Sequence, residues 1–389
     1  MSSLPQAEES PTREQFLDRA SALLPVLRER ASLTERMRRI PPETVADVLA
    51  TDLHLLGVPL KFGGLDVDYG LSLDVGVELA RACPSTSWCY SLWVVHSWLA
   101  GYWPLRAQEE VFARGPNALI SSSLSPGKST CSPVEGGYML SGRWEFSSGC
   151  DAADWLMLGV GGIGQRNWAL LPRSDFQIID TWFVSGLKGS GSKDIQIKEA
   201  FIPAHRILEV STAGDTDMTG WELHRQPRYR VPIPVLLGWD LVAPIIGLGR
   251  GMVEEFTGRL SGTSGAGRTA DSATIQLRLS LAAAEVDAAH ALMAKDVREA
   301  LVKGGNGEPF TTLERARYRR DKAFATQLCL QAANRIFDLS GGHALFDSDA
   351  LQRFHRDAHA IAHRDTLIMD VGGLQYGRAV LGLEPDGAI

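Results

Sequence analysis

Cysteine is scarce in this sequence and is not clustered: the 389 residues contain five, with no Cys-x-x-Cys spacing. An odd number of scattered cysteines suits neither a disulfide framework nor a cysteine-rich zinc site, and it favours a reducing compartment. Positive charge is not in excess either, because 39 Lys and Arg stand against 46 Asp and Glu, a net charge of −7. A mildly acidic chain without a basic block is not expected to bind nucleic acid or anionic membranes.

A long uninterrupted apolar run is also missing. The N-terminal residues are polar and acidic, unlike a secretory signal. Two apolar stretches invite a membrane interpretation, but residues 88–105 contain four Trp, a His and a Pro, and residues 231–249 contain three Pro and an Asp. We expect buried helices at both places, and hence a cytoplasmic protein with no membrane partner.

No GxSxG elbow, Walker A loop or kinase HRD motif is present. Residues 159–164 match the dinucleotide pattern GxGxxG, which requires a helix directly after it. The residues that follow, QRNWALLP, have the pattern of a strand. We therefore predict a glycine-rich hairpin turn. The sequence GLKGSGSKD at 186–194 lacks a GK[ST] ending and is expected to be a loop.

The hydrophobic period divides the chain into three parts. Helical spacing, as in Phe16, Ala20, Leu23 and Leu27, continues to about residue 117. Residues 118–212 consist of short β-rich segments separated by turn residues, which predicts a run of antiparallel strands. Helical spacing returns in 213–389 as four long segments. The predicted domains are thus 1–117 (helical), 118–212 (β) and 213–389 (helical).

Three histidines, His355, His359 and His363, repeat at intervals of four residues on a predicted helix. Over two helical turns they diverge by about 12 Å, too far to hold one ion, so no metal site is predicted. His96 lies within an apolar helix and needs a polar partner, either in the core or in a pocket against the β-domain. From the residues alone, the chain is an acidic α/β/α protein with a small-molecule pocket, or a non-catalytic helical interaction protein.

Four segments together resemble the acyl-CoA dehydrogenase fold, and within it the flavin-dependent monooxygenase branch. SGRWEFSSGCDAADW (141–155) is similar to the pattern GxWxFxSGxxxADW, and GLKGSGSKDIQIKEAFIPAHRIL (186–208) to GxRGTGSxDxxxxxxFVPxxxxL. STSWCYSLWVVHSW (85–98) resembles SxAWxxxxxxxH, and LQRFHRDAHAIAHR (351–364) resembles LQRxxRDxxxxxxH. The resemblance covers nearly the whole chain in the same order.

The resemblance implies a mainly α fold with a central β-domain and a C-terminal four-helix bundle, packed as a homotetramer. It implies the oxygenase component of a two-component system. In such systems a separate NAD(P)H:flavin reductase supplies reduced FMN or FADH2, O2 is the co-substrate, and a C4a-hydroperoxyflavin hydroxylates a small aromatic substrate.

The resemblance also assigns residues. Trp88, Phe146 and Ser147 match positions that line the flavin, Arg268 approximately matches a phosphate-binding Arg, and the pair Gly341 and Gly342 matches glycines that approach a neighbouring subunit's flavin. His96, Ser122 and His363 match the polar positions that face a phenolic substrate. A phenolate bound there gains ring electron density, which favours attack on an electrophilic oxygen.

One departure bears on the reaction. The two family positions for the catalytic Glu of a true dehydrogenase fall near Asp365 and Asp240 here, and Asp is one methylene shorter. This disfavours acyl-CoA dehydrogenation, while N- or S-oxygenation of an amine or thioether stays open as an alternative to ring hydroxylation. Residues 85–105 contain no Lys or Arg, so we expect a substrate without an anionic group.

Overall fold

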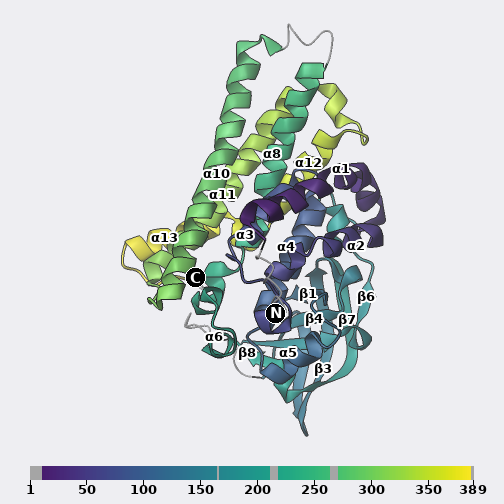
Figure 1. The fold of residues 1–389 in the computed structure, drawn as a ribbon, viewed down its shortest axis with the longest axis vertical. Coiled ribbons are helices and arrows are strands. Elements are labelled where there is room, and N and C mark those ends of the chain that lie inside the picture. The colour runs from purple at the N-terminus through teal and green to yellow at the C-terminus, as the bar shows by residue number, and fades with distance from the viewer. Residues whose placement is uncertain (1–10, 164–165, 211–217, 263–269, 387–389) are drawn as a thin grey trace, which may run out of the picture.

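The computed structural model describes residues 11–163, 166–210, 218–262 and 270–386. Within them the chain passes from helices to strands and back to helices (Figure 1). The helices before the strands are α1 (Arg13–Met37), α2 (Pro42–Ala50), α3 (Leu71–Ala80), α4 (Pro84–Ala100) and α5 (Leu105–Val111), with short 3-10 turns at Leu53–Leu56 and Leu60–Phe62. Thr12 begins α1 with a capping box, which satisfies two of its free N–H groups.

The middle of the chain forms two four-stranded sheets. One sheet has the order β1-β4-β5-β8, and the other β2-β3-β7-β6. The strands are β1 (Ile120–Ser123), β2 (Lys128–Val134), β3 (Gly137–Ser147), β4 (Trp155–Val160), β5 (Asn167–Pro172), β6 (Gln177–Ile179), β7 (Lys193–Pro203) and β8 (Ile207–Glu209). The expectation of purely antiparallel strands is wrong at one place, because β1 pairs with β4 in parallel. The antiparallel expectation holds for the other pairs.

The predicted hairpin is confirmed. β4 and β5 pair antiparallel from Trp155 opposite Pro172 to Val160 opposite Asn167. No helix follows Val160 in the described part of this turn, and Gly164 lies outside the described residues. The GxGxxG match is therefore a turn in a β-sheet rather than a dinucleotide-binding loop.

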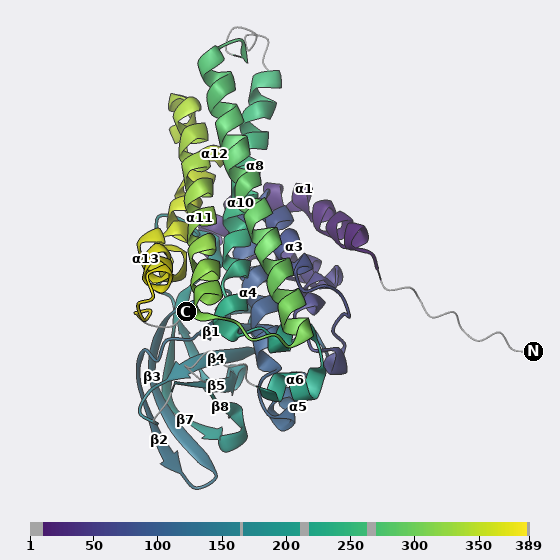
Figure 2. The same ribbon diagram turned by 90° about the vertical axis from the view of Figure 1, so that its left-hand side faces the viewer.

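The remaining helices form the C-terminal part. Their bounds are α6 (Met218–His224), α7 (Ile233–Leu236), α8 (Trp239–Gly262), α10 (Ala273–Asn306), α11 (Thr312–Leu339), α12 (Ala350–Ala362) and α13 (Met369–Val380). Instead of the four long segments expected, three long helices precede two short ones. In Figures 1 and 2, α8 and α10 extend beyond the rest of the molecule at the end opposite the sheets.

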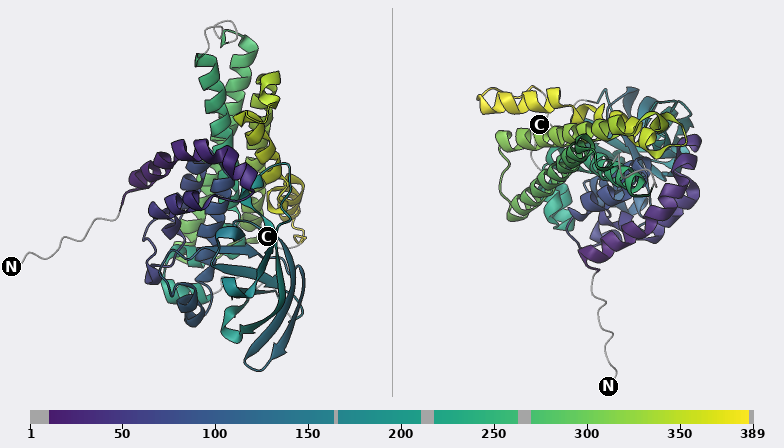
Figure 3. Two further views of the ribbon diagram at one scale, coloured as in Figure 1. Left: turned by 90° about the vertical axis from the view of Figure 1, so that its right-hand side faces the viewer. Right: turned by 90° about the horizontal axis from the view of Figure 1, so that it is seen from above.

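Helix α8 joins the two helical parts of the chain. It packs on α3 and α4 of the N-terminal part and on α10, α11 and α12 of the C-terminal part. The segment Ile233–Ser261 is long and apolar enough to cross a membrane by composition, but 78% of its most apolar window is buried inside the fold. This burial agrees with the expectation of a core helix. Figure 3 shows α1 lying across the helical part of the molecule.

Candidate active site

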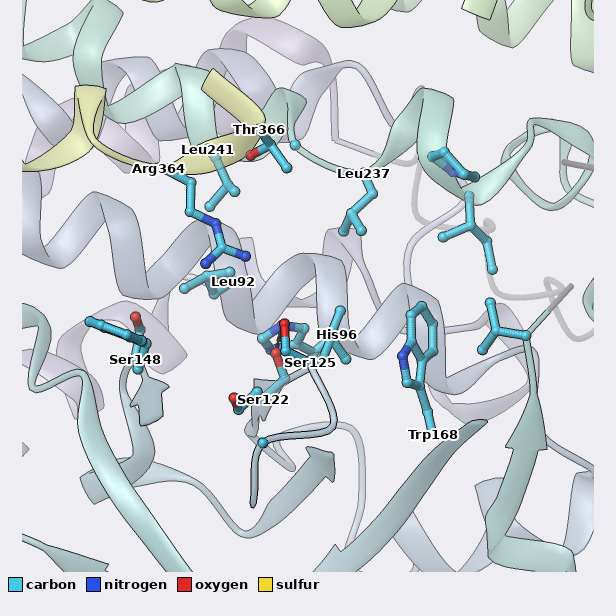
Figure 4. A pocket seen from close by; sticks show the side chains of 18 of the residues that line it. Leu92, His96, Ser122, Ser125, Ser148, Trp168, Leu237, Leu241, Arg364 and Thr366 are labelled. Atoms are coloured by element: carbon cyan, nitrogen blue, oxygen red, sulfur yellow. Dashed lines mark hydrogen bonds between the residues drawn. The ribbon is translucent and has the colours of Figure 1, made fainter. Parts of the chain in front are cut away.

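A cavity of about 750 Å³ lies where the β-domain meets α4, α7, α8 and α11. Three residues one turn apart on α4, Trp88, Leu92 and His96, face it, as positions i, i+4 and i+8 of one helical face do. The β-domain contributes Ser122 at the end of β1 and Trp168 on β5. In Figure 4, Ser148 and Trp168 lie on opposite sides of His96, so the cavity has a Ser148 end and a Trp168 end.

His96 and Ser122 form a hydrogen-bonded pair on the wall of this cavity. His96 Nδ1 lies 2.8 Å from the carbonyl oxygen of Ile120, which only accepts, so Nδ1 carries the proton. His96 Nε2 then has a free lone pair and accepts from Ser122 Oγ at 2.7 Å. The hydroxyl of Ser122 is thereby oriented, and its oxygen lone pairs are left for a ligand.

The imidazole of His96 is neutral. Burial lowers its pKa from 6.5 to about 4, and the hydrogen bond to Ile120 offsets only part of this effect. His96 is 2% exposed, so a charge on its ring would have little solvent to stabilise it. The pair is thus a hydrogen-bond acceptor for a substrate hydroxyl rather than a cation.

Ser148, rather than the predicted Ser147, lines the cavity. Ser148 Oγ accepts from Trp88 Nε1 at 3.0 Å and lies 2.6 Å from Ser192 Oγ. Ser147 is fully buried, and its hydroxyl bonds to Ser121 Oγ at 2.9 Å. The register irregularity of β3 between Trp144 and Ser147 shifts the alternation of its side chains, which the sequence pattern does not reveal.

Phe146 and Trp88 both line the cavity, as the resemblance implied. Phe146 has φ of 63°, a left-handed conformation that is costly for an aromatic residue. Its ring is 60% exposed and makes an edge contact with Trp182 at 6.0 Å between centroids. A strained aromatic held at the edge of a cavity suggests a role in ligand contact.

The structure does not bring His363 to this cavity. His363 follows α12 directly, its side chain is exposed, and its Nδ1 bonds to the carbonyl of His359 at 2.7 Å. His355 and His359 turn toward α11, where both bond to Asn334 Oδ1 at 2.9 Å. The residues that reach the cavity from this region are instead Arg364 and Thr366.

Two further predicted positions lie away from the cavity of this chain. Gly341 and Gly342 begin the 3-10 turn Gly342–Leu345 after α11, and a Cβ added at either glycine would meet nothing within 4 Å. Arg268 lies outside the described residues. No group of three or more His, Cys, Asp or Glu side chains suited to a metal ion occurs in the described chain.

The cavity wall is positively charged. Its described residues include six cations and Glu145 as the one carboxylate; the cations are Lys128, Arg143, Arg166, Arg319, Lys322 and Arg364. The expectation of a substrate without an anionic group rested on residues 85–105, which contain no cation. The cations of the assembled cavity come from β2, β3, α11 and loops instead. Long-range packing brought them together, and no local pattern marked them.

Neither aspartate at a family base position is placed as a dehydrogenase base. Asp365 has an exposed side chain, and Asp240 is buried; neither lines the cavity. Burial raises the pKa of Asp240 to about 7, and Ser72 Oγ lies 3.2 Å from its Oδ1. The site therefore lacks a placed carboxylate for removing a substrate α-proton at either position.

Comparison with known proteins identifies the family. The model of the acyl-CoA dehydrogenase C-terminal domain matches residues 240–366. The oxygenase subunit HsaA of a flavin-dependent monooxygenase from Mycobacterium tuberculosis is 36% identical over 87% of this chain and 88% of its own. The oxygenase component of the FADH2-dependent resorcinol hydroxylase from Rhizobium sp. is 31% identical over 100% of this chain and 99% of its own. The crystal structure of M. tuberculosis HsaA superposes with a TM-score of 0.91 at 33% identity, covering 97% of this chain and 99% of that one.

The chain belongs to the oxygenase components of flavin-dependent monooxygenases. It has the acyl-CoA dehydrogenase fold and is a monooxygenase that uses a reduced flavin.

The residues of this oxygenase component fit a flavin at the Ser148 end of the cavity. A cavity of about 750 Å³ holds a ligand much larger than a phenol. The indole of Trp88, the ring of Phe146 and the hydroxyl of Ser148 offer a flat apolar wall with one polar contact, and Lys128, Arg143 and Arg364 offer positive charge for an anionic cofactor. The Trp168 end is left for the substrate.

Proposed function

We propose that this oxygenase component hydroxylates a phenolic aromatic substrate, with His96 and Ser122 as the residues that contact the phenol. The observation that carries the proposal is the ordered pair itself: a neutral imidazole whose Nε2 accepts from Ser122 Oγ, on the wall of a cavity large enough for flavin and substrate together. The flavin supplies the activated oxygen when bound. The chain's own residues orient the ring and receive its proton.

The energetics favour a late proton transfer. A phenol has a pKa near 10, about six units above the pKa of His96, which is about 4. Proton transfer from the phenol to His96 before any change in the ring would therefore cost about 8 kcal/mol. As oxygen adds to the ring, the phenolic proton becomes strongly acidic and this cost disappears. We therefore expect the phenol hydroxyl to donate to Ser122 Oγ at first, and its proton to pass through Ser122 to His96 as the new C–O bond forms.

Trp88, Phe146 and Ser148 are proposed flavin contacts, with Ser148 taking the place first assigned to Ser147. His363 is not part of the proposed catalytic pair, because its side chain is exposed in the single chain. Gly341 and Gly342 remain proposed contacts to the flavin of a neighbouring subunit, and Arg268 remains a proposed phosphate-binding residue.

Other proposals concern the setting of the reaction. No dinucleotide-binding loop is formed at residues 159–163, so we propose a separate NAD(P)H:flavin reductase as partner and the cytoplasm as location.

We also propose the domain limits 1–117, 118–212 and 213–389, and a homotetramer. Large apolar side chains are exposed at Leu345, Phe346, Leu374 and Leu381, which suits burial between subunits. Light scattering at micromolar concentration should report a multiple of 42.3 kDa, and a monomer mass would contradict the tetramer.

The test is a single turnover with chemically reduced FMN or FADH2, oxygen and a panel of phenols, amines and thioethers. We expect hydroxylated phenol as product, with no NADH oxidation by the chain alone. Product from amines or thioethers only would contradict the phenol role of His96 and Ser122. Acyl-CoA-dependent dye reduction without any oxygenated product would contradict a monooxygenase.

A further inference from the structure

One wall of the cavity is a short segment that runs from α7 into α8. We name residues 233–241 the α7–α8 wall; five of them line the cavity, namely Ile233, Pro234, Leu237, Gly238 and Leu241. In Figure 4, Leu237 and Leu241 lie across the cavity from His96. The position of this wall therefore sets the room for a ring that is bound at His96 and Ser122.

The α7–α8 wall has few backbone hydrogen bonds of its own. Helix α7 has only four residues, and its last bond runs from the N–H of Leu237 to the carbonyl of Ile233 at 2.8 Å. Gly238, with φ of 99°, then turns the chain toward α8. Carbonyls at the end of a helix have no partner within that helix, so those of Pro234, Val235 and Leu237 need a donor from elsewhere in the fold.

Lys322 of α11 is that donor. Its Nζ lies 2.8 Å from the carbonyl oxygen of Leu237, 3.2 Å from that of Pro234 and 3.4 Å from that of Val235. An ammonium has three N–H groups, so each of them has one acceptor in this wall. Lys322 is 3% exposed, and these carbonyl dipoles compensate its buried charge.

The wall also lies against the stem of this lysine. A Cβ built on Gly238 would lie 3.6 Å from Lys322 Cδ, which is ordinary van der Waals contact. Val235 is 1% exposed, so its carbonyl has little access to solvent if the lysine is removed. Leaving buried acceptors without a donor costs free energy, and the wall would shift to reduce that cost. Because Leu237 and Leu241 belong to the wall, such a shift would change the shape of the cavity.

We propose that Lys322 is a positioning residue that selects the substrate by size. It holds the α7–α8 wall at a fixed place opposite His96 and Ser122, and it acts through Leu237 and Leu241 rather than by binding the substrate. This inference rests on the proposed function, since it assumes that the phenol binds at His96 and Ser122. It assigns size selection to α11, a helix on which the sequence marked no site residue.

The first measurement is hydrogen exchange of the protein without flavin or substrate. Lys322→Met has a similar unbranched stem without donors, and Lys322→Gln keeps two N–H groups. We expect amide exchange in the α7–α8 wall to be about tenfold faster in the Met variant than in the wild type, and intermediate in the Gln variant, because lost hydrogen bonds lower local stability. Exchange in β3, which carries the proposed flavin contacts, should not change.

All variants are compared at the same pH. Burial lowers the pKa of Lys322 to about 7, and only the ammonium form has three N–H groups. Arg319 lowers this pKa too, while Asp296 and Asp240 raise it. The comparison is therefore made at about pH 6, where Lys322 is charged in the wild type.

The second measurement is hydroxylation of uncharged para-alkylphenols whose alkyl groups have one to four carbons. In a fitted apolar pocket one methylene changes kcat/KM by about tenfold or more, and we expect such a difference between the best and the worst phenol for the wild type. Lys322→Met should reduce this ratio to about threefold or less through KM, with kcat of the best phenol within about twofold of the wild-type value. Lys322→Gln should lie between the two, and the Kd of reduced flavin should be unchanged in both variants.

Lys303→Met is the matched control. Lys303 forms an ion pair with Glu314 between α10 and α11 and does not line the cavity. Its removal should lower the melting temperature and leave the size ratio unchanged. If Lys322→Met does not fold, Lys322→Gln carries the test against the same control.

The other outcomes are also decisive. A wild type without size preference, faster exchange of the wall with an unchanged size ratio, or an equal rise of KM for every phenol would overturn the proposal. Loss of reduced-flavin binding in both Lys322 variants would place the lysine at the cofactor and refute it. If no phenol is hydroxylated, the proposed function fails, while hydrogen exchange and the calorimetric affinities of the same phenols still decide the role of Lys322.

Discussion

Ser122 Oγ donates to His96 Nε2 at 2.7 Å, which joins the end of a β-strand to the middle of an apolar helix across the cavity wall. This bond and the bond to the Ile120 carbonyl together fix the imidazole tautomer. The serine oxygen is thereby oriented to accept a hydrogen bond from a ligand. A side chain with an ordinary histidine pKa would be partly charged near neutral pH. The depressed pKa of His96 removes that charge and leaves an acceptor pair matched to a hydroxyl donor.

His96→Ala is expected to reduce phenol hydroxylation by about 10²- to 10⁴-fold, the usual contribution of a positioned acid–base group. Oxygen consumption should continue, so H2O2 released per product should rise. Quantifying product and H2O2 in one single-turnover experiment checks this. His54 is a matched control, since it is also buried with a lowered pKa but bonds to Asn117 away from the cavity. His54→Ala should leave product per folded enzyme unchanged, and wild-type hydroxylation by His96→Ala would refute the role.

The buried neutral state of His96 also predicts acid sensitivity. Its pKa is about 4 in the folded chain and about 6.5 when unfolded, so between these values the unfolded chain binds more protons and stability falls with falling pH. The stabilisation is complete above about pH 6.5, and about 2 kcal/mol of it is lost by pH 5. In urea unfolding, the free energy of unfolding should therefore decrease less between pH 7.5 and pH 5.0 for His96→Gln than for the wild type. His224, with a pKa lowered to about 4 by burial and then by Arg228, stays in both proteins, so the difference isolates His96. Equal losses would contradict the assignment.

The order of helices, sheets and helices was predictable because periodicity is a local signal. The strand Lys128–Val134 carries no clear strand signal in the sequence, because most of its residues are exposed and it contains Pro133, so it lacks apolar alternation. The strand Ile207–Glu209 is too short for its sequence to show a hydrophobic period. The parallel pairing of β1 with β4 joins two segments that are separated in the sequence by β2 and β3, and no local pattern encodes such a pairing.

The candidate site was predictable only where one segment carries it. His96 and Trp88 share a helical face, and spacing alone places them together. Ser148 was missed in favour of Ser147 because a strand irregularity changes which hydroxyl faces the cavity. No sequence signal marked Lys322 as a cavity residue, because its surroundings form only when the turn after α7 packs against α11.

Phe146 offers a test of backbone strain. Both Phe146→Ala and Phe146→Gly remove the edge contact with Trp182, but only glycine adopts φ of 63° without strain. We expect the Gly variant to be more stable than the Ala variant by about 1 kcal/mol, the reverse of the usual order. Phe183 is a control, because its ring is also exposed and its φ is not positive. The melting temperature should be higher for Ala than for Gly at position 183, and higher for Gly than for Ala at position 146. The same order at both positions would contradict backbone strain at Phe146.

The neighbouring serines 147 and 148 separate a structural hydroxyl from a proposed flavin contact. Ser148→Ala removes the cavity-facing oxygen that accepts from Trp88, so reduced flavin should bind more weakly and product per O2 consumed should fall several-fold. Ser147→Ala removes only a buried bond to Ser121, whose hydroxyl keeps its bond to the Ser148 carbonyl. It should cost about 1 kcal/mol of unfolding free energy and leave product per O2 unchanged. Flavin titration, urea unfolding and product-to-O2 ratios of both variants check this pair. If Ser147→Ala changed the coupling ratio and Ser148→Ala did not, the original assignment of Ser147 to the flavin would be the better one, because both variants remove the same group one residue apart.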